Sequence, residues 1–429
     1  MSTRTIKLDM ISRVEGEGGL TLKVKDGVLT ELKLHIFESP RFFEGILRGR
    51  RLEEAPDITS RICGICPVAY QISSASAMEN ALGIELPPVL LDLRRLILYG
   101  EWIESHMLHV HLLHAPDFLR YSDAIAMAKE HPKEVQRGLG LKQLGNRIVS
   151  VVGGREVHPV NIRVGGFYSY PSEPSMRELR ADLAHAIDEC ESVVRWVSSF
   201  EFPDDETPAE FVAIRGRGAY PLLGGEIESS NGTSIPISGF DSEFEEDQLE
   251  HSTAMHSHRR NGDSYLVGPL ARFHLSRGVL TPRAQALARE CLPGGAIRNP
   301  YRSIVVRAIE TLVALEGSLQ IVESYEPTGA PNVGYRARAG VGFGCSEAPR
   351  GFCWHRYGIT ADGLIESARI VPPTSQNLAQ IEVDLFAFAS ARLELPDEEL
   401  KTECERAVRN HDPCISCSVH FLNMRIERS

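Results

Sequence analysis

Long apolar runs are missing from this sequence: none reaches the roughly 18 residues that a helix needs to cross a bilayer. The N-terminus, Met-Ser-Thr-Arg-Thr-Ile-Lys, has no apolar signal core, so we expect a cytoplasmic protein. Acidic residues outnumber basic ones, and the net charge of −12 argues against a nucleic-acid-binding surface. Nine cysteines is an odd count, which argues against a disulfide framework.

What is present predicts a large mixed fold. The 429 residues exceed the roughly 250–300 that one core usually supports. Apolar and polar residues alternate on either side of an Asp-Gly turn in residues 5–36, which predicts a β-hairpin. A second Asp-Gly turn predicts another β-hairpin over residues 351–370. Residues 203–275, with paired glycines and several prolines, predict a β-rich or loop-rich lobe. Apolar residues at helical spacing predict helices over 67–82, 90–113, 175–200, 300–324 and 377–392. We therefore expect one domain over 1–429 of mixed α and β class, predominantly α, with a central buried helix bundle, peripheral β-hairpins and a small β-rich lobe.

Two Cys-x-x-Cys pairs lie at opposite ends of the chain, Cys63 with Cys66 and Cys414 with Cys417. Two thiolates on one turn suit a soft or borderline metal. A structural zinc site usually gathers its ligands within roughly 20 residues, so ligands from both ends predict a metal deep inside the finished fold. One pair alone would also fit buried thiols, a zinc half-site or a redox dithiol. The other cysteines are expected to be small buried apolar residues: Cys190, Cys291, Cys345, Cys353 and Cys404.

The segments around both pairs, Arg61-Ile-Cys-Gly-Ile-Cys-Pro67 and Asp412-Pro-Cys-Ile-Ser-Cys-Ser-Val-His420, resemble the large subunit of the nickel–iron hydrogenases. The resemblance extends over nearly the whole chain and implies the same mixed fold. It implies that all four cysteines bind nickel, with Cys63 and Cys414 terminal, and with Cys66 and Cys417 bridging to an iron that carries carbon monoxide and cyanide. The implied reaction is heterolytic cleavage and formation of dihydrogen.

A second cation site follows from the same resemblance. His420 and Glu44, within Phe43-Glu-Gly-Ile-Leu-Arg-Gly-Arg50, match family ligands of a Mg²⁺ (or Fe²⁺) beside the centre, with the carbonyl of Ile370 as a third ligand. A hard cation prefers such oxygen ligands. Without the resemblance, an ion pair with the neighbouring arginines would explain Glu44 equally well.

Four more residues are implied to handle protons and charge. Glu15 matches a glutamate that passes protons between a nickel-bound cysteine and the exterior, which a carboxyl group can do where its surroundings favour the protonated form. Arg350 matches an arginine placed over the open side of the metals, where it polarises dihydrogen or accepts a proton. Asp117 and Asp412 correspond to the carboxylates that hold this arginine.

The surroundings of the metals are also implied. Pro349, next to Arg350, and Pro373 and Thr374 match segments near the centre, and the Thr374 hydroxyl is expected to donate to a cyanide. Tyr70 stands where many relatives have a histidine that donates toward a bridging sulfur; tyrosine can also donate. The segment around Tyr70, like residues 158–168, resembles the cytoplasmic branch coupled to nicotinamide nucleotides, which includes the sulfhydrogenases.

The chain has no further cysteine motif for an iron–sulfur cluster and no Gly-x-Gly-x-x-Gly after a strand. We therefore expect electrons to leave through another subunit. The resemblance implies that this is an iron–sulfur small subunit, followed by ferredoxin-like and flavin subunits that bind NAD or NADP. Nickel-insertion proteins and a maturation peptidase are further implied partners, with residues 421–429 either cleaved or ordered as a tail. Sulfur reduction by the complex stays open.

Two other functions remain as alternatives. A hydrogen sensor would keep all four cysteines, whereas the complex I subunit of this fold, a quinone-site and coupling element, lacks them. Clustered histidines also invite a zinc or diiron interpretation, although packing and hydrogen bonding are expected for them: His106, His109, His111, His114 and, further on, His158.

Overall fold

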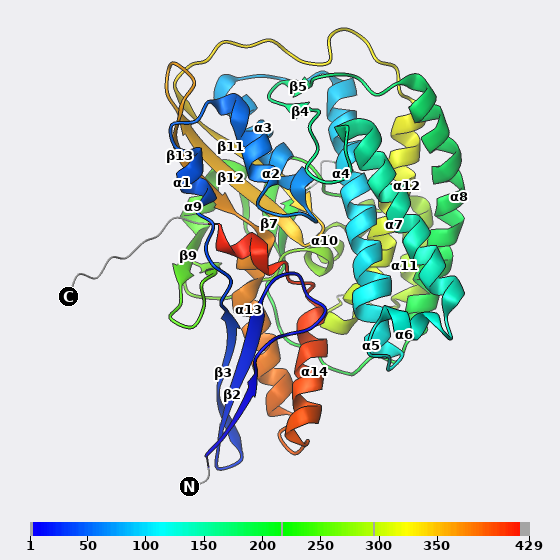
Figure 1. The fold of residues 1–429 in the computed structure, drawn as a ribbon, viewed down its shortest axis with the longest axis vertical. Helices are drawn as coiled ribbons and strands as arrows, with labels where there is room; N and C mark the ends of the chain where they lie inside the picture. Colours follow the sequence, from blue (N-terminus) through cyan, green and yellow to red (C-terminus); the bar gives the residue numbers. More distant parts are fainter. Residues whose placement is uncertain (1–2, 216–217, 295–296, 421–429) are drawn as a thin grey trace, which may run out of the picture.

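The computed structural model describes residues 3–215, 218–294 and 297–420. Long helices form one side of the molecule, and small sheets with further helices form the other (Figure 1). The mixed fold with a helix bundle is as expected from the sequence. Within the described ranges, no helix combines the length and the apolarity that a membrane crossing requires.

The bundle is built from helices that bury apolar faces against one another. Helix α4 packs against α7 and α12, and α12 also packs against α8. Nearly every residue in the first three turns of α12 is buried, which places this helix in the core. The bundle helices are α4 (Pro88–Leu108), α7 (Pro132–Gly153), α8 (Glu173–Ser198), α11 (Pro282–Cys291) and α12 (Ser303–Glu323).

Antiparallel strands make up the other side. The β1-β2-β3 sheet contains the expected N-terminal hairpin, and the β11-β12-β13 sheet contains the second. The remaining pairs are short, and those within residues 203–275 run from β6 to β10. The strands are β1 (Thr3–Leu8), β2 (Gly18–Lys25), β3 (Val28–Ile36), β4 (Ile162–Arg163), β5 (Gly166–Phe167), β6 (Val212–Arg215), β7 (Glu226–Ser229), β8 (Ser234–Pro236), β9 (Phe244–Gln248), β10 (Met255–Arg259), β11 (Gly340–Ala348), β12 (Gly351–Ile359) and β13 (Ile365–Val371).

Helix α3 (Pro67–Leu82) lies directly on β11, and two glycines make this possible. A Cβ on Gly342 would come within 1.9 Å of the Ala77 carbonyl oxygen, and one on Gly344 within 2.1 Å of the Ser73 oxygen. Any side chain at these two positions would force the helix away from the strand. The close contact holds the N-terminal end of α3, where Cys66 lies, against the sheet.

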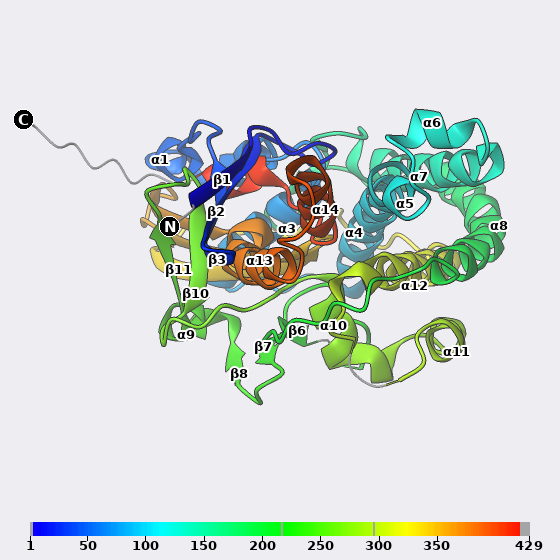
Figure 2. The same ribbon diagram turned by 90° about the horizontal axis from the view of Figure 1, so that it is seen from below.

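The C-terminal region adds α13 (Pro373–Ser390) and α14 (Asp397–Arg409). Helix α13 packs on β3 and β10, and it contacts the 3₁₀ helix Ile415–Val419 near the chain end (Figure 2). The expected helix over 90–113 is present but changes to a π-helix at His109–His114. The short helices are α1 (Phe43–Leu47), α2 (Ala55–Ser60), α5 (Ala115–Phe118), α6 (Ala124–Ala128), α9 (Phe240–Glu243) and α10 (Pro269–Ser276).

Candidate metal centre

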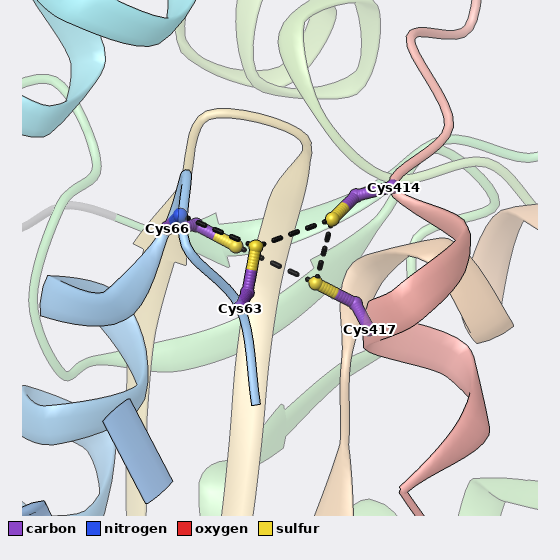
Figure 3. Close-up of side chains that lie close together, drawn as sticks. All are labelled: Cys63, Cys66, Cys414 and Cys417. Carbon is purple, nitrogen blue, oxygen red and sulfur yellow. Dashed lines mark hydrogen bonds between the residues drawn. The ribbon is translucent and has the colours of Figure 1, made fainter. Parts of the chain in front are cut away.

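The four cysteines of the two pairs meet in the core (Figure 3). Cys66 caps the N-terminus of α3, and Cys414 precedes the 3₁₀ helix Ile415–Val419. The Sγ atoms are 3.3 Å apart for Cys63 and Cys414, 3.5 Å for Cys66 and Cys417, and 2.9 Å for Cys414 and Cys417. All four side chains are buried and all four thiols are free. The fold therefore brings both ends of the chain to one sulfur cluster, as the sequence predicts.

The electrostatics of the cluster oppose four negative charges in the absence of a cation. Hydrogen bonds from Cys414, Cys417 and Cys66 hold the pKa of Cys63 well below its usual value. Burial raises the pKa of Cys414 well above its usual value, and the neighbouring thiols raise it further. The thiolate of Cys63 is thus stabilised, whereas burial and the neighbouring sulfurs oppose further thiolates. A bound metal would allow all four cysteines to lose their protons. A buried set of four sulfur donors fits a nickel–iron centre.

Glu15 connects this cluster to the outside. The Cys414 thiol donates to Glu15 Oε2 at 3.1 Å, and the backbone N–H of Ser416 donates to the same oxygen at 3.0 Å. The backbone is joined as well, because the Ile415 N–H donates to the Glu15 carbonyl at 2.9 Å. Glu15 is only half-buried, so its carboxyl group touches a cluster sulfur without being sealed in the core.

Arg350 is held by Asp412, as expected. Its Nε donates to the Asp412 carbonyl at 2.7 Å and its Nη2 to Asp412 Oδ1 at 3.0 Å, while Nη1 donates to Ser105 at 3.3 Å. Burial opposes the charge, but Asp412 and the cysteine sulfurs together raise the pKa of Arg350 well above its usual value. The guanidinium therefore stays protonated beside the sulfurs, which favours a polarising role over that of a base.

The expectation that Asp117 also holds Arg350 is wrong. Its carboxylate accepts hydrogen bonds from Arg409 at 2.7 and 3.0 Å and forms an ion pair with Arg13. The physical reason is position: the fold brings the Asp117 side chain on α5 within hydrogen-bonding distance of Arg409 in the last turn of α14. Asp117 thus ties the N-terminal segment to α14, and Ser105 is the additional partner of Arg350.

A buried charge network that the motifs did not reveal supports the segment before Arg350. Arg272 donates to Glu310 at 2.7 Å from both Nε and Nη2, and to Glu347 at 2.8 Å. It also donates to the carbonyls of Ala348 and Pro349 at 2.9 Å. Although burial opposes ionisation of Glu310, Arg272 lowers its pKa to about 2. The signal in the sequence was a pair of charged residues, Arg307 and Glu310, among the apolar residues in the first turns of α12.

Thr374 and Tyr70 border the cluster from two sides. The backbone N–H of Cys414 donates to Thr374 Oγ1 at 3.1 Å, at the start of α13, where Pro373 is the first residue. The Tyr70 hydroxyl is buried and has no hydrogen-bond partner among the described residues. The expected donation from Tyr70 to a cysteine sulfur is therefore not made here. Burial raises the pKa of Tyr70 well above its usual value, so the phenol keeps its proton.

Glu44, Ile370 and His420 lie together at the edge of the cluster. The Ile370 N–H donates to Glu44 Oε1 at 2.8 Å. The His420 ring lies between two carbonyl oxygens, with Nε2 2.6 Å from that of Ile370 and Nδ1 2.6 Å from that of Cys417. Residues far apart in the sequence thus assemble as one group.

The clustered histidines have ordinary partners. His106 lies 3.0 Å from Glu310, His109 lies 2.8 Å from a backbone carbonyl of α14, and His114 lies 2.8 Å from an asparagine side chain. His111 stacks on a tryptophan ring. Among the described residues these histidines form no group of three metal-ligating side chains, which fits the expected packing role. His158, elsewhere, lies 2.8 Å from the carbonyl oxygen of a serine.

Comparison with known proteins agrees with this geometry. A family model described as nickel-dependent hydrogenase matches residues 41–145 and 303–420. The chain is 33% identical over 425 residues to sulfhydrogenase 1 subunit alpha of Pyrococcus furiosus, with 98% of each chain covered. It is 35% identical over 422 residues to sulfhydrogenase 2 subunit alpha of the same organism, with 98% of this chain and 100% of that one covered. The structure of an NAD⁺-reducing nickel–iron hydrogenase in the H₂-reduced state matches with a TM-score of 0.85 at 26% identity, covering 98% of this chain and 100% of that chain. The chain therefore belongs to the nickel-dependent hydrogenase family, as the catalytic large subunit of a nickel–iron hydrogenase.

Proposed function

We propose that this subunit exchanges electrons between dihydrogen and NAD or NADP, through a small subunit with iron–sulfur clusters and a flavin subunit. The observation that carries the proposal is the buried site of four cysteine sulfurs, in which the Cys414 thiol donates a hydrogen bond to Glu15. Two relatives are named sulfhydrogenase subunits, and the structural relative is named NAD⁺-reducing, which supports this choice of electron acceptor. In the described part of the chain, no second cysteine cluster offers a path for electrons.

At the centre, Cys63 and Cys414 would be terminal nickel ligands, and Cys66 and Cys417 would bridge nickel to an iron that carries carbon monoxide and cyanide. When bound, this pair supplies the redox chemistry that takes up the two electrons of dihydrogen. Pro349, Pro373 and Thr374 would border the diatomic ligands. Because Thr374 Oγ1 accepts the Cys414 N–H, its own proton is free to be donated to a cyanide.

Residues of this chain then transfer the proton that cleavage of dihydrogen releases. The Cys414 sulfur holds it first and donates it to Glu15 Oε2, along the hydrogen bond already present. Glu15 releases it outward from its half-buried position. Arg350, kept charged by Asp412, places a fixed positive charge beside the sulfurs and so stabilises the negative charge that a departing proton leaves behind.

A magnesium ion beside the centre would be held by Glu44, the Ile370 carbonyl and His420. The contacts of His420 support this, because a neutral imidazole carries one N–H yet both ring nitrogens face carbonyl oxygens at 2.6 Å. A cation shared by Nε2, the Ile370 carbonyl and the Glu44 carboxylate would replace one of those contacts. Carboxylate and carbonyl oxygens suit Mg²⁺.

The test is hydrogen-dependent reduction of NAD and NADP by the purified complex, together with its metal content and infrared spectrum. We expect about one nickel and one iron per large subunit at the cysteines, since four thiolates in two pairs match one such centre. Bands of iron-bound carbon monoxide and cyanide and rapid reduction of a nucleotide should accompany them. Zinc alone without the bands would refute the centre. Normal bands with only slow dye reduction would favour a hydrogen sensor.

A further inference from the structure

A second group of metal-ligating side chains lies outside the cysteine cluster. His251 stands in the turn between β9 and β10, His256 on β10, and Glu382 in the middle of α13. Their ligand atoms all lie within 4.8 Å of one another. Figure 2 shows β3, β10 and α13 side by side, and the two strands both contact the helix. Two segments distant in the sequence, the β9–β10 region and α13, thus supply the three side chains.

The group is only partly satisfied by its own hydrogen bonds. His251 Nε2 lies 2.9 Å from Glu382 Oε1, and the Leu34 N–H donates to the same oxygen at 2.8 Å. Both bonds fall on Oε1, so Oε2 keeps its lone pairs for another partner. His256 is 2% exposed, and neither of its ring nitrogens has a hydrogen-bond partner among the described residues. A buried polar group without a hydrogen-bond partner destabilises the fold by about 1–3 kcal/mol, and a bound ligand at His256 would remove this cost.

We propose that His251, His256 and Glu382 bind one divalent cation of the zinc type, at a site separate from the nickel–iron centre. Two imidazoles and a carboxylate are a ligand set that zinc commonly takes in proteins, with a water molecule in the fourth position. The cation would replace the proton that His251 shares with Glu382 and would give His256 its missing partner.

Neighbouring residues hold the histidines in place. His35 on β3 meets the His251 ring edge-on at 5.7 Å, while its own Nε2 lies 2.8 Å from the Thr21 hydroxyl. Thr253 donates its N–H and its hydroxyl to the Ile36 carbonyl at 2.7 and 2.9 Å. The loop that carries His251 is thereby fixed to the end of β3, which is the support that metal-ligating imidazoles need.

The site would connect the outer strands to the reaction centre through α13. The first turn of this helix contains Thr374, which accepts the Cys414 N–H. A cation that ties α13 to β10 therefore stabilises the helix that borders the cysteines. Its role would be mechanical, because Glu382 lies more than two helical turns from Thr374.

The experiment uses the intact complex with its nickel–iron centre loaded, so that the cysteines are already occupied. The complex is equilibrated with zinc in a chelator buffer, and zinc, nickel and iron are counted per large subunit. We expect about one zinc beyond the nickel and iron, with X-ray absorption showing imidazole and oxygen neighbours only. Absence of extra zinc, or sulfur among its neighbours, would overturn the site.

Two variants locate the ion. His256→Phe keeps the ring volume without a nitrogen, and Glu382→Gln keeps an acceptor for the Leu34 N–H. Each should weaken zinc binding by more than about 100-fold, since even partners of ligands are worth 10–100-fold. Each should also abolish the rise in melting temperature that zinc produces. His258→Phe, on the same strand but paired with Asp247, is the matched control and should bind zinc normally. Unchanged zinc affinity in both variants, with normal nickel content, would refute the proposal.

Discussion

Replacing Glu15 with glutamine tests the proposed proton route most directly. The variant keeps the shape of the side chain and an oxygen that can accept the Ser416 N–H, now at 3.0 Å. It cannot take a proton from the Cys414 sulfur, which lies 3.1 Å from Oε2. We expect normal nickel and iron content, because glutamine can still accept the Ser416 N–H and the backbone bond from Ile415 to residue 15 is unchanged.

Turnover and hydrogen–deuterium exchange should both fall by about 10²-fold or more, the scale of a lost acid–base group. This fall corresponds to about 2.7 kcal/mol in the activation free energy. Exchange is the sharper assay, because it requires proton transfer but no electron acceptor. Glu17→Gln, at an exposed position two residues away, is the matched control and should behave as wild type. Near-normal exchange in Glu15→Gln would show that protons take another route.

Three further predictions concern Arg350, His111 and the C-terminal residues 421–429. Arg350→Lys keeps the charge but loses the paired bonds to Asp412, so turnover should fall about 10- to 100-fold at unchanged nickel content; unchanged turnover would contradict the role given to the guanidinium. Burial lowers the pKa of His111 to about 4, so between that value and about 6.5 the unfolded chain binds the extra proton and stability falls with falling pH. His111→Phe should therefore remove about 2 kcal/mol of the loss in unfolding free energy between pH 7 and pH 5, measured with denaturant, and an unchanged pH slope would disprove this. Residues 421–429 lie outside the described residues, and we expect the intact mass of the active enzyme to end at His420; a chain ending at Ser429 with full nickel occupancy would exclude cleavage.

The sequence alone was sufficient to identify the four cysteines that meet in the core and much of the secondary structure. The two Cys-x-x-Cys pairs could be recognised as metal ligands from local sequence, because two thiolates on one turn suit a metal wherever that turn lies in the fold. Helices α4 and α12 were predictable because apolar residues at helical spacing must be buried. Helices α7 and α14 were not predicted: each has a broad polar face, and only packing on neighbouring helices selects the helical state for them.

The partners of charged side chains were decided only by the tertiary structure. The resemblance implied that Asp117 and Asp412 both hold Arg350, yet the fold pairs Asp117 with Arg409 on α14 and leaves Arg350 to Asp412. In the same way, no local spacing connects His256 to Glu382, because a strand and a helix bring them together from distant parts of the chain. Periodicity in a sequence reports which face of an element is buried. Which atoms meet across the interface depends on the angle and register at which two elements pack, and those are properties of the whole fold.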